Sequence, residues 1–159
     1  MLRGFLRTDN DPAALIMRLT LALVFFPHGA QKVLGWFGGY GASATIQYFG
    51  KMGLPAWVTV LVMAAEFGGP ILLVLGFLTR FAALGIGAVM LAAWLMVHAK
   101  VGFFMNWAGS QKGEGFEYHI LALGLSLALL IKGGGAFSID RALTRDELGS
   151  EASPALPRM

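Results

Sequence analysis

Three ionisable side chains, Arg18, His28 and Lys32, lie within one apolar stretch near the start of the chain. An ionisable residue inside a membrane span costs roughly 2.5 to 3.5 kcal/mol on insertion scales, so each one needs a partner or a function. At about 100° per residue, the three fall within one helical sector of about 80°. They predict a polar stripe that faces the protein interior and donates hydrogen bonds to a bound head group. The structural alternative is that Arg18 and Lys32 snorkel to opposite head-group layers.

Glu66 stands near the middle of a second apolar stretch and is too deep to snorkel. Either it is protonated, because burial disfavours the charged carboxylate, or it is paired with a cation from the first stretch. It could carry a proton or accept a hydrogen bond from a bound head group, and with His28 it forms the predicted catalytic pair. Alternatively, it belongs to a structural ion pair that fixes helix register.

Further polar side chains are expected at the depth of His28, in the outer half of the membrane: His98, Glu117 and His119. Three histidines with Glu66 or Glu117 would suffice for zinc, copper or iron. No two of them share a metal-binding spacing on one helix, so a metal is the less favoured interpretation. Haem ligation by His28 and His98 is less favoured still.

Aromatic residues crowd the same edge, and Trp107 is one of them. Most suit the aromatic belt at a membrane interface. A flat ring between aromatic faces, with a histidine and a cation reaching its carbonyl oxygens, is also how a quinone head group would be held. The predicted cofactor-binding residues are therefore Arg18, His28, Lys32, His98, Glu117, His119 and Trp107.

These residues must be positioned by helices, because four apolar stretches of roughly membrane-spanning length dominate the chain. The predicted fold is all-α, a single four-helix transmembrane bundle. Asp11-Pro12 indicates the first helix start, since Asp caps and Pro fits the first turn. A short interfacial helix is expected in the first outer loop, within 37–55, and polar tails at both ends. The predicted spans cover about 13–36, 56–77, 80–103 and 116–131, and the tails 1–12 and 141–159.

Composition excludes several function classes. Hydrophobic residues make up 57% of the 159 positions and charged residues 13%, and the mean hydropathy is +0.68. The net charge of +3 comes from scattered basic residues, not a patch, which argues against nucleic-acid binding. The absence of cysteine excludes thiol and iron–sulfur chemistry by this chain alone. A redox role would need a bound cofactor or a partner.

Basic residues also predict the orientation in the membrane. With four spans, both termini and the turn between the second and third spans share one side. Arg18 is left out of the count because it lies within the first span. The side of the termini then has seven basic residues and the opposite side has four. The seven are Arg3, Arg7, Arg80, Lys132, Arg141, Arg145 and Arg158, and the four are Lys32, Lys51, Lys100 and Lys112. The excess predicts that both termini are cytoplasmic.

Five short motifs follow one another along the chain: Arg18, His28-Gly29-x-x-Lys32, Glu66-x-Gly68-Gly69, Gly76-x-x-Thr79-Arg80 and Ser138-Ile139-Asp140. In this ordered set the chain resembles the DoxX family of small bacterial and archaeal membrane proteins, over about Leu15 to Asp140. The resemblance implies a four-helix protein of the inner membrane. The family's namesake is the membrane subunit of a thiosulfate:quinone oxidoreductase, and other members are linked to redox and thiol-stress complexes. His119 lies outside the family pattern.

The polar stripe, the aromatic rim and the resemblance together predict a redox-linked membrane subunit that binds a quinone-like lipid. No complete active site is visible, so the chain is at most one subunit of an oxidoreductase, with a soluble or membrane redox partner. The alternative is a non-enzymatic scaffold or assembly factor whose polar stripe is an ion-pair network. A weaker alternative is a metal or small-solute binding protein.

Overall fold

Helices account for all regular structure in residues 2–144, the part of the chain that this computed structural model describes. Within these residues there is no strand, which confirms the predicted all-α class. The predicted C-terminal tail, 141–159, lies outside the described residues from 145 onward. The elements are α1 (Leu2–Leu6), α2 (Pro12–Val33), α3 (Gly41–Lys51), α4 (Ala56–Met63), the π-helical η1 (Ala64–Gly68), α5 (Gly69–Leu75), α6 (Thr79–Met96), the 3₁₀-helical η2 (His98–Lys100) and α7 (Glu117–Lys132).

Three helical segments are long and apolar enough to cross a membrane: Pro12–Val33, Ala56–Leu75 and Thr79–Met96. The second is one continuous rod made of α4, η1 and α5. Helix α7 has 16 residues, about 24 Å at 1.5 Å per residue, less than the roughly 30 Å of a hydrocarbon core. The described residues therefore hold three candidate spans and a shorter fourth helix packed along α6.

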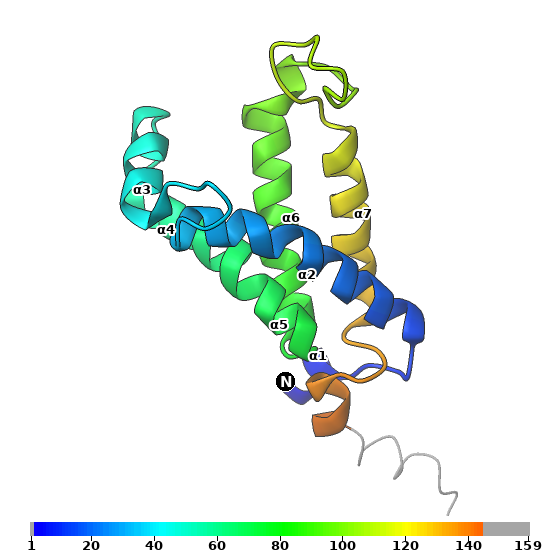
Figure 1. Ribbon diagram of the computed structural model, residues 1–159. Helices are drawn as coiled ribbons and strands as arrows, with labels where there is room; N and C mark the ends of the chain where they lie inside the picture. Colours follow the sequence, from blue (N-terminus) through cyan, green and yellow to red (C-terminus); the bar gives the residue numbers. More distant parts are fainter. Residues whose placement is uncertain (1, 145–159) are drawn as a thin grey trace, which may run out of the picture.

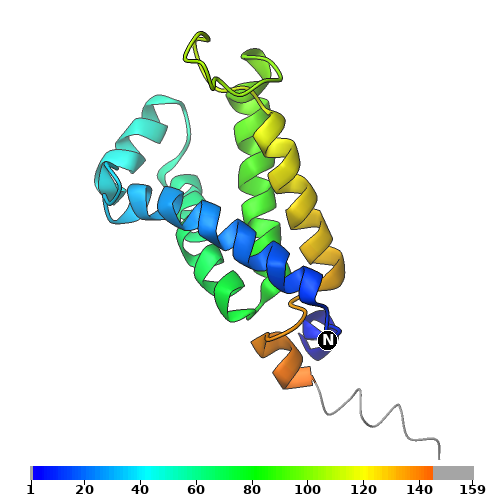
Figure 2. The ribbon, with the colours of Figure 1, turned by 45° about the vertical axis from the view of Figure 1, so that its right-hand side comes forward.

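The two ends of the molecule differ (Figures 1 and 2). The terminal end holds α1, the start of α2 and residues 139–144. The opposite, loop end holds α3 and the connection from α6 to α7, and in both views α3 stands apart from α6 and α7. The helix predicted within 37–55 is therefore present as α3, at the end away from the termini.

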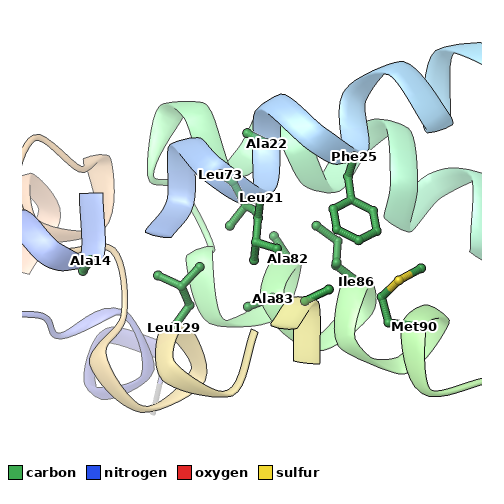
Figure 3. Close-up of a cluster of buried hydrophobic side chains, with 11 residues drawn as sticks. Ala14, Leu21, Ala22, Phe25, Leu73, Ala82, Ala83, Ile86, Met90 and Leu129 are labelled. Carbon is green, nitrogen blue, oxygen red and sulfur yellow. The ribbon is translucent and has the colours of Figure 1, made fainter. Parts of the chain in front are cut away.

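The core lies where α2 crosses the α5 and α6 helices (Figure 3). Leu21, Ala22 and Phe25 of α2 meet Leu73 of α5 and Ile86 of α6, and all five are almost fully buried. Small residues elsewhere in the cluster, such as those on α6, let the helix backbones approach closely. This packing fixes the angle at which α2 crosses the rod formed by α4, η1 and α5. It therefore also fixes where the polar side chains of α2 lie relative to that rod.

Backbone hydrogen bonds to side chains fix the terminal end. Asp11 caps α2 by accepting from the Ala13 amide at 2.8 Å, as predicted from Asp11-Pro12. The Asp140 carboxylate accepts from the amides of Leu78 and Thr79 at 2.8 and 2.9 Å, and so caps the start of α6.

Arg80 ties the N-terminal segment to the bundle. Its guanidinium donates to the carbonyls of Phe5 and Arg7, at 2.6 and 2.9 Å, and to those of Leu130 and Ile131 at the end of α7. The region predicted as a polar tail thus contains a short helix and is held against α6 and α7. Arginine can do this because its planar fork donates several hydrogen bonds in different directions.

Candidate functional site

A cavity of about 520 Å³ lies between α2, α3, α4, η1, α6 and α7 on the side of the loop end. Most of its wall is apolar, from residues such as Phe25, Phe49, Val89 and Met90. Its volume is in the range of small-molecule sites, and such sites combine an apolar wall with a few convergent polar groups. Five of the residues predicted from the sequence line it: His28, Lys32, Glu66, His98 and His119.

Lys32 and Glu66 form an ion pair across this cavity wall. The Lys32 Nζ lies 2.5 Å from Glu66 Oε2, and the two side chains are 23% and 6% exposed. Of the two states considered for Glu66, the structure therefore shows the carboxylate paired with a cation of the first span. The pair leaves little net charge in a largely apolar pocket, as burial of two charges requires.

The backbone brings the two partners together by an unusually close helix crossing. A Cβ built on Gly29 would collide with backbone atoms of Glu66 and Phe67, so only glycine fits at this point of α2. The crossing falls within η1, whose wider π-helical turn contains Glu66. Single π-helical turns inside α-helices occur frequently at functional sites. Gly29 and η1 thus set the register in which Lys32 reaches Glu66.

A second polar group lines the cavity from η2 and α7. The rings of His98 and His119 are in contact, with centroids 4.2 Å apart, and Tyr118 packs edge-on against His119. His119 is buried at 4% exposure. Within residues 2–144 neither the Tyr118 hydroxyl nor His119 Nδ1 has a hydrogen-bond partner. Buried polar atoms without partners are uncommon, and in a cavity wall they suit a ligand that supplies the missing partner.

Three predicted site residues lie away from this cavity. Arg18 is fully buried nearer the terminal end, where its guanidinium donates to four carbonyls, those of Leu73, Val74, Ala136 and Phe137, at 2.7 to 3.2 Å. It holds the end of α5 against the glycine-rich exit from α7. Glu117, the first residue of α7, accepts hydrogen bonds from the Met105 amide and the Trp107 indole, so Glu117 and Trp107 lie together at the loop end.

Several lining residues were not singled out from the sequence. Glu114 lies at the loop side of the cavity, where its side chain accepts from the Asn106 amide at 2.7 Å. It was missed because it sits in a glycine-containing loop with no periodicity. Four methionines also line the wall, and as ordinary apolar residues they gave no signal: Met52, Met90, Met96 and Met105.

Metal binding gains no geometric support within the described residues. Among residues 2–144 no group of three or more His, Asp or Glu side chains is arranged to hold a metal ion. His28 approaches Phe25, whereas His98 and His119 contact each other.

Comparisons with known proteins give the family. The DoxX family model matches residues 13–99. The inner membrane protein YqjF of Escherichia coli is 35% identical over 137 residues, covering 86% of this chain and 95% of that protein. A Bacillus subtilis protein named "Putative oxidoreductase CatD" is 30% identical, covering 72% and 76% of the two chains. The inner membrane protein YphA of E. coli is 31% identical, covering 80% and 87%. No solved structure matches.

Proposed function

The chain belongs to the DoxX family of inner-membrane proteins, and we propose that it binds the head group of a quinone-like lipid in the cavity as a redox-linked membrane subunit. The observation that carries the proposal is the cavity itself. It is apolar over most of its wall, and within residues 2–144 two of its polar atoms, the Tyr118 hydroxyl and His119 Nδ1, have no hydrogen-bond partner. The name of the B. subtilis relative supports an oxidoreductase role.

The polar residues suit the chemistry of a quinone, whose two carbonyl oxygens accept hydrogen bonds and which takes up two electrons and two protons on reduction. Tyr118 offers an unpaired hydroxyl and His28 an imidazole beside the Lys32–Glu66 pair. We assign Lys32 and His28 to hydrogen bonding of the head group. Glu66 holds or releases a proton, since its charge is balanced by a lysine that can turn to the ligand instead. Electrons would come from a partner protein, because the chain has no thiol.

The membrane arrangement is part of the proposal. We place α7 across the membrane as a fourth span, with the bilayer thinned locally or the flanking chain completing the crossing. Both termini then lie in the cytoplasm and the cavity in the outer half of the bilayer. The apolar surface of α7, including the exposed Leu121, Leu127 and Ile131, is what a lipid-facing helix requires.

The test is a quinone titration of the protein purified in mild detergent, together with extraction and identification of any quinone that co-purifies. We expect saturable binding that Glu66→Gln and His28→Ala weaken at least about tenfold, as loss of a buried hydrogen bond to a ligand does. Glu117→Gln is the matched control, because it makes the same carboxylate-to-amide change outside the cavity. Absence of quinone from the wild type, or equal effects of Glu66→Gln and Glu117→Gln, would refute the proposal.

A scaffold or assembly factor is the second candidate, and Arg18 and Arg80 favour it. The guanidinium of each arginine donates to four backbone carbonyls, and these hydrogen bonds hold the fold together. If the Lys32–Glu66 pair also serves only the fold, Glu66→Gln and His28→Ala should lower the thermal stability, and the wild type itself should bind no quinone. The same titration, read beside a melting curve, separates the two candidates.

A further inference from the structure

His98 and His119 form a contact between the buried wall of the cavity and the loop end. His119 is buried at 4% exposure and lines the cavity from α7. His98 is half-buried, begins η2, and lines the same cavity where the chain leaves α6 for the loop. With ring centroids 4.2 Å apart, the two imidazoles are in direct contact.

The hydrogen bond of His98 fixes its tautomer. His98 Nδ1 lies 2.8 Å from the backbone carbonyl of Glu114. A carbonyl oxygen can only accept, so Nδ1 carries the hydrogen and Nε2 keeps its lone pair when the ring is neutral. His119 Nδ1 has no hydrogen-bond partner within residues 2–144. In its neutral form His98 can therefore bind a proton at Nε2, and His119 Nδ1 can bind or release one.

We propose that His98 and His119 are a proton-exchange pair that connects the cavity with water at the loop end. A water-derived proton leaves its oxygen and binds Nε2 of His98, so one O–H bond breaks and one N–H bond forms. The imidazolium then passes that proton to a ring nitrogen of His119, which releases a proton into the cavity. Use of this path in quinone chemistry rests on the proposed function, but the exchange itself does not. The other ionisable groups that line the cavity are His28 and Lys32 of α2, Tyr48 of α3, Glu66 of η1, Tyr118 of α7 and Glu114 of the loop.

The path gives the cavity a route to water that is separate from the Lys32–Glu66 pair. Glu66 is buried and paired, so a proton that it releases needs a second group to reach water. The histidine pair runs from a buried residue to a half-buried one along the cavity wall. Imidazoles suit the role because each ring has two nitrogens, one of which can bind a proton while the other keeps its own.

The experiment measures the exchange with water of the His119 ring N–H by NMR of ligand-free, ¹⁵N-histidine-labelled protein in lipid nanodiscs. His98→Gln keeps a donor for the Glu114 carbonyl but cannot relay a proton, and we expect it to slow the exchange roughly tenfold or more, with added free imidazole restoring the rate. His98→Phe keeps the packing of the ring but cannot bind a proton. It should slow the exchange in the same way, and it replaces His98→Gln as the test if the glutamine disturbs folding. Lys100→Gln, in the same 3₁₀ turn but not lining the cavity, should leave the rate unchanged.

An exchange rate that both His98 variants leave unchanged or raise would overturn the proposal. So would an equal slowing by Lys100→Gln, since that would assign the effect to the turn and not to the imidazole. Because no quinone is present, failure here is independent of failure in the quinone titration. Slowed exchange in a protein that binds no quinone would keep the proton path and remove its proposed ligand.

Discussion

Lys32 and Glu66 are each unfavourable in a membrane span when alone, but as an ion pair they can both be accommodated there. Each charge alone would carry the full cost of burial, whereas together they lie 2.5 Å apart in a wall that is mostly apolar. A buried pair of this kind adds little net stability, but the loss of one partner leaves the other charge uncompensated. We therefore expect the two single substitutions to lower the free energy of unfolding by different amounts, and the double substitution to lower it less than the sum of the two.

Lys32→Met should destabilise the protein by about 3 kcal/mol, because it leaves the Glu66 carboxylate buried without a cation. Glu66→Gln should cost less, since Lys32 is 23% exposed and can turn toward solvent. Adding Glu66→Gln to Lys32→Met should recover at least half of the loss. Unfolding of all four proteins in mixed micelles measures the cycle, and strictly additive effects would contradict the pairing.

At the scale of helices, hydropathy predicted the first two spans well and the third poorly. The helix predicted to run to 103 ends at Met96, although the residues after it remain largely apolar. The reason is a tertiary pairing that composition does not show. The carbonyls of Gly102 and Phe103 accept from the amides of Phe116 and Glu117, so the chain leaves the helical path to cap the start of α7.

The polar site could be predicted only in part, for a similar reason. Helical periodicity correctly grouped His28 with Lys32, which both line the cavity. The same periodicity placed Arg18 on that stripe, but about three turns away its guanidinium meets carbonyls of α5 and of the exit from α7. The π-helical turn at Glu66 could not be predicted from the sequence, because one extra residue per turn changes neither composition nor hydropathy.

The crossing of α2 over η1 yields a prediction at this scale. Gly29→Ala should destabilise the protein by about 1 to 3 kcal/mol, as overpacking does, since its Cβ would meet backbone that cannot move aside cheaply. Gly124→Ala in α7 is the matched control, because a Cβ there meets nothing within 4 Å, and it should be neutral or stabilise by up to about 1 kcal/mol. Equal melting temperatures for the two variants would show that the helices do not cross as closely as described.

For the whole molecule, the residues that carry the family resemblance divide between two places. Arg18, Arg80 and Asp140 bind backbone groups toward the terminal end and fix how the helices and the glycine-rich exit meet. His28, Gly29, Lys32 and Glu66 build the cavity nearer the loop end. The first set of residues thus holds the helices together, and the second set forms the candidate site. The whole ordered set is therefore more informative than any single motif.

Which side of the membrane the cavity faces decides where a proton relayed by His98 is exchanged. The absence of cysteine allows a direct test, because a single introduced thiol is the only labelling site. Asp9, at the terminal end, and Lys112, in the loop between α6 and α7, are both exposed. With cytoplasmic termini, a membrane-impermeant maleimide should label Lys112→Cys in intact cells and Asp9→Cys only after the membrane is opened. The reverse pattern would turn the cavity toward the cytoplasm, so that the histidine pair would exchange protons with the cell interior.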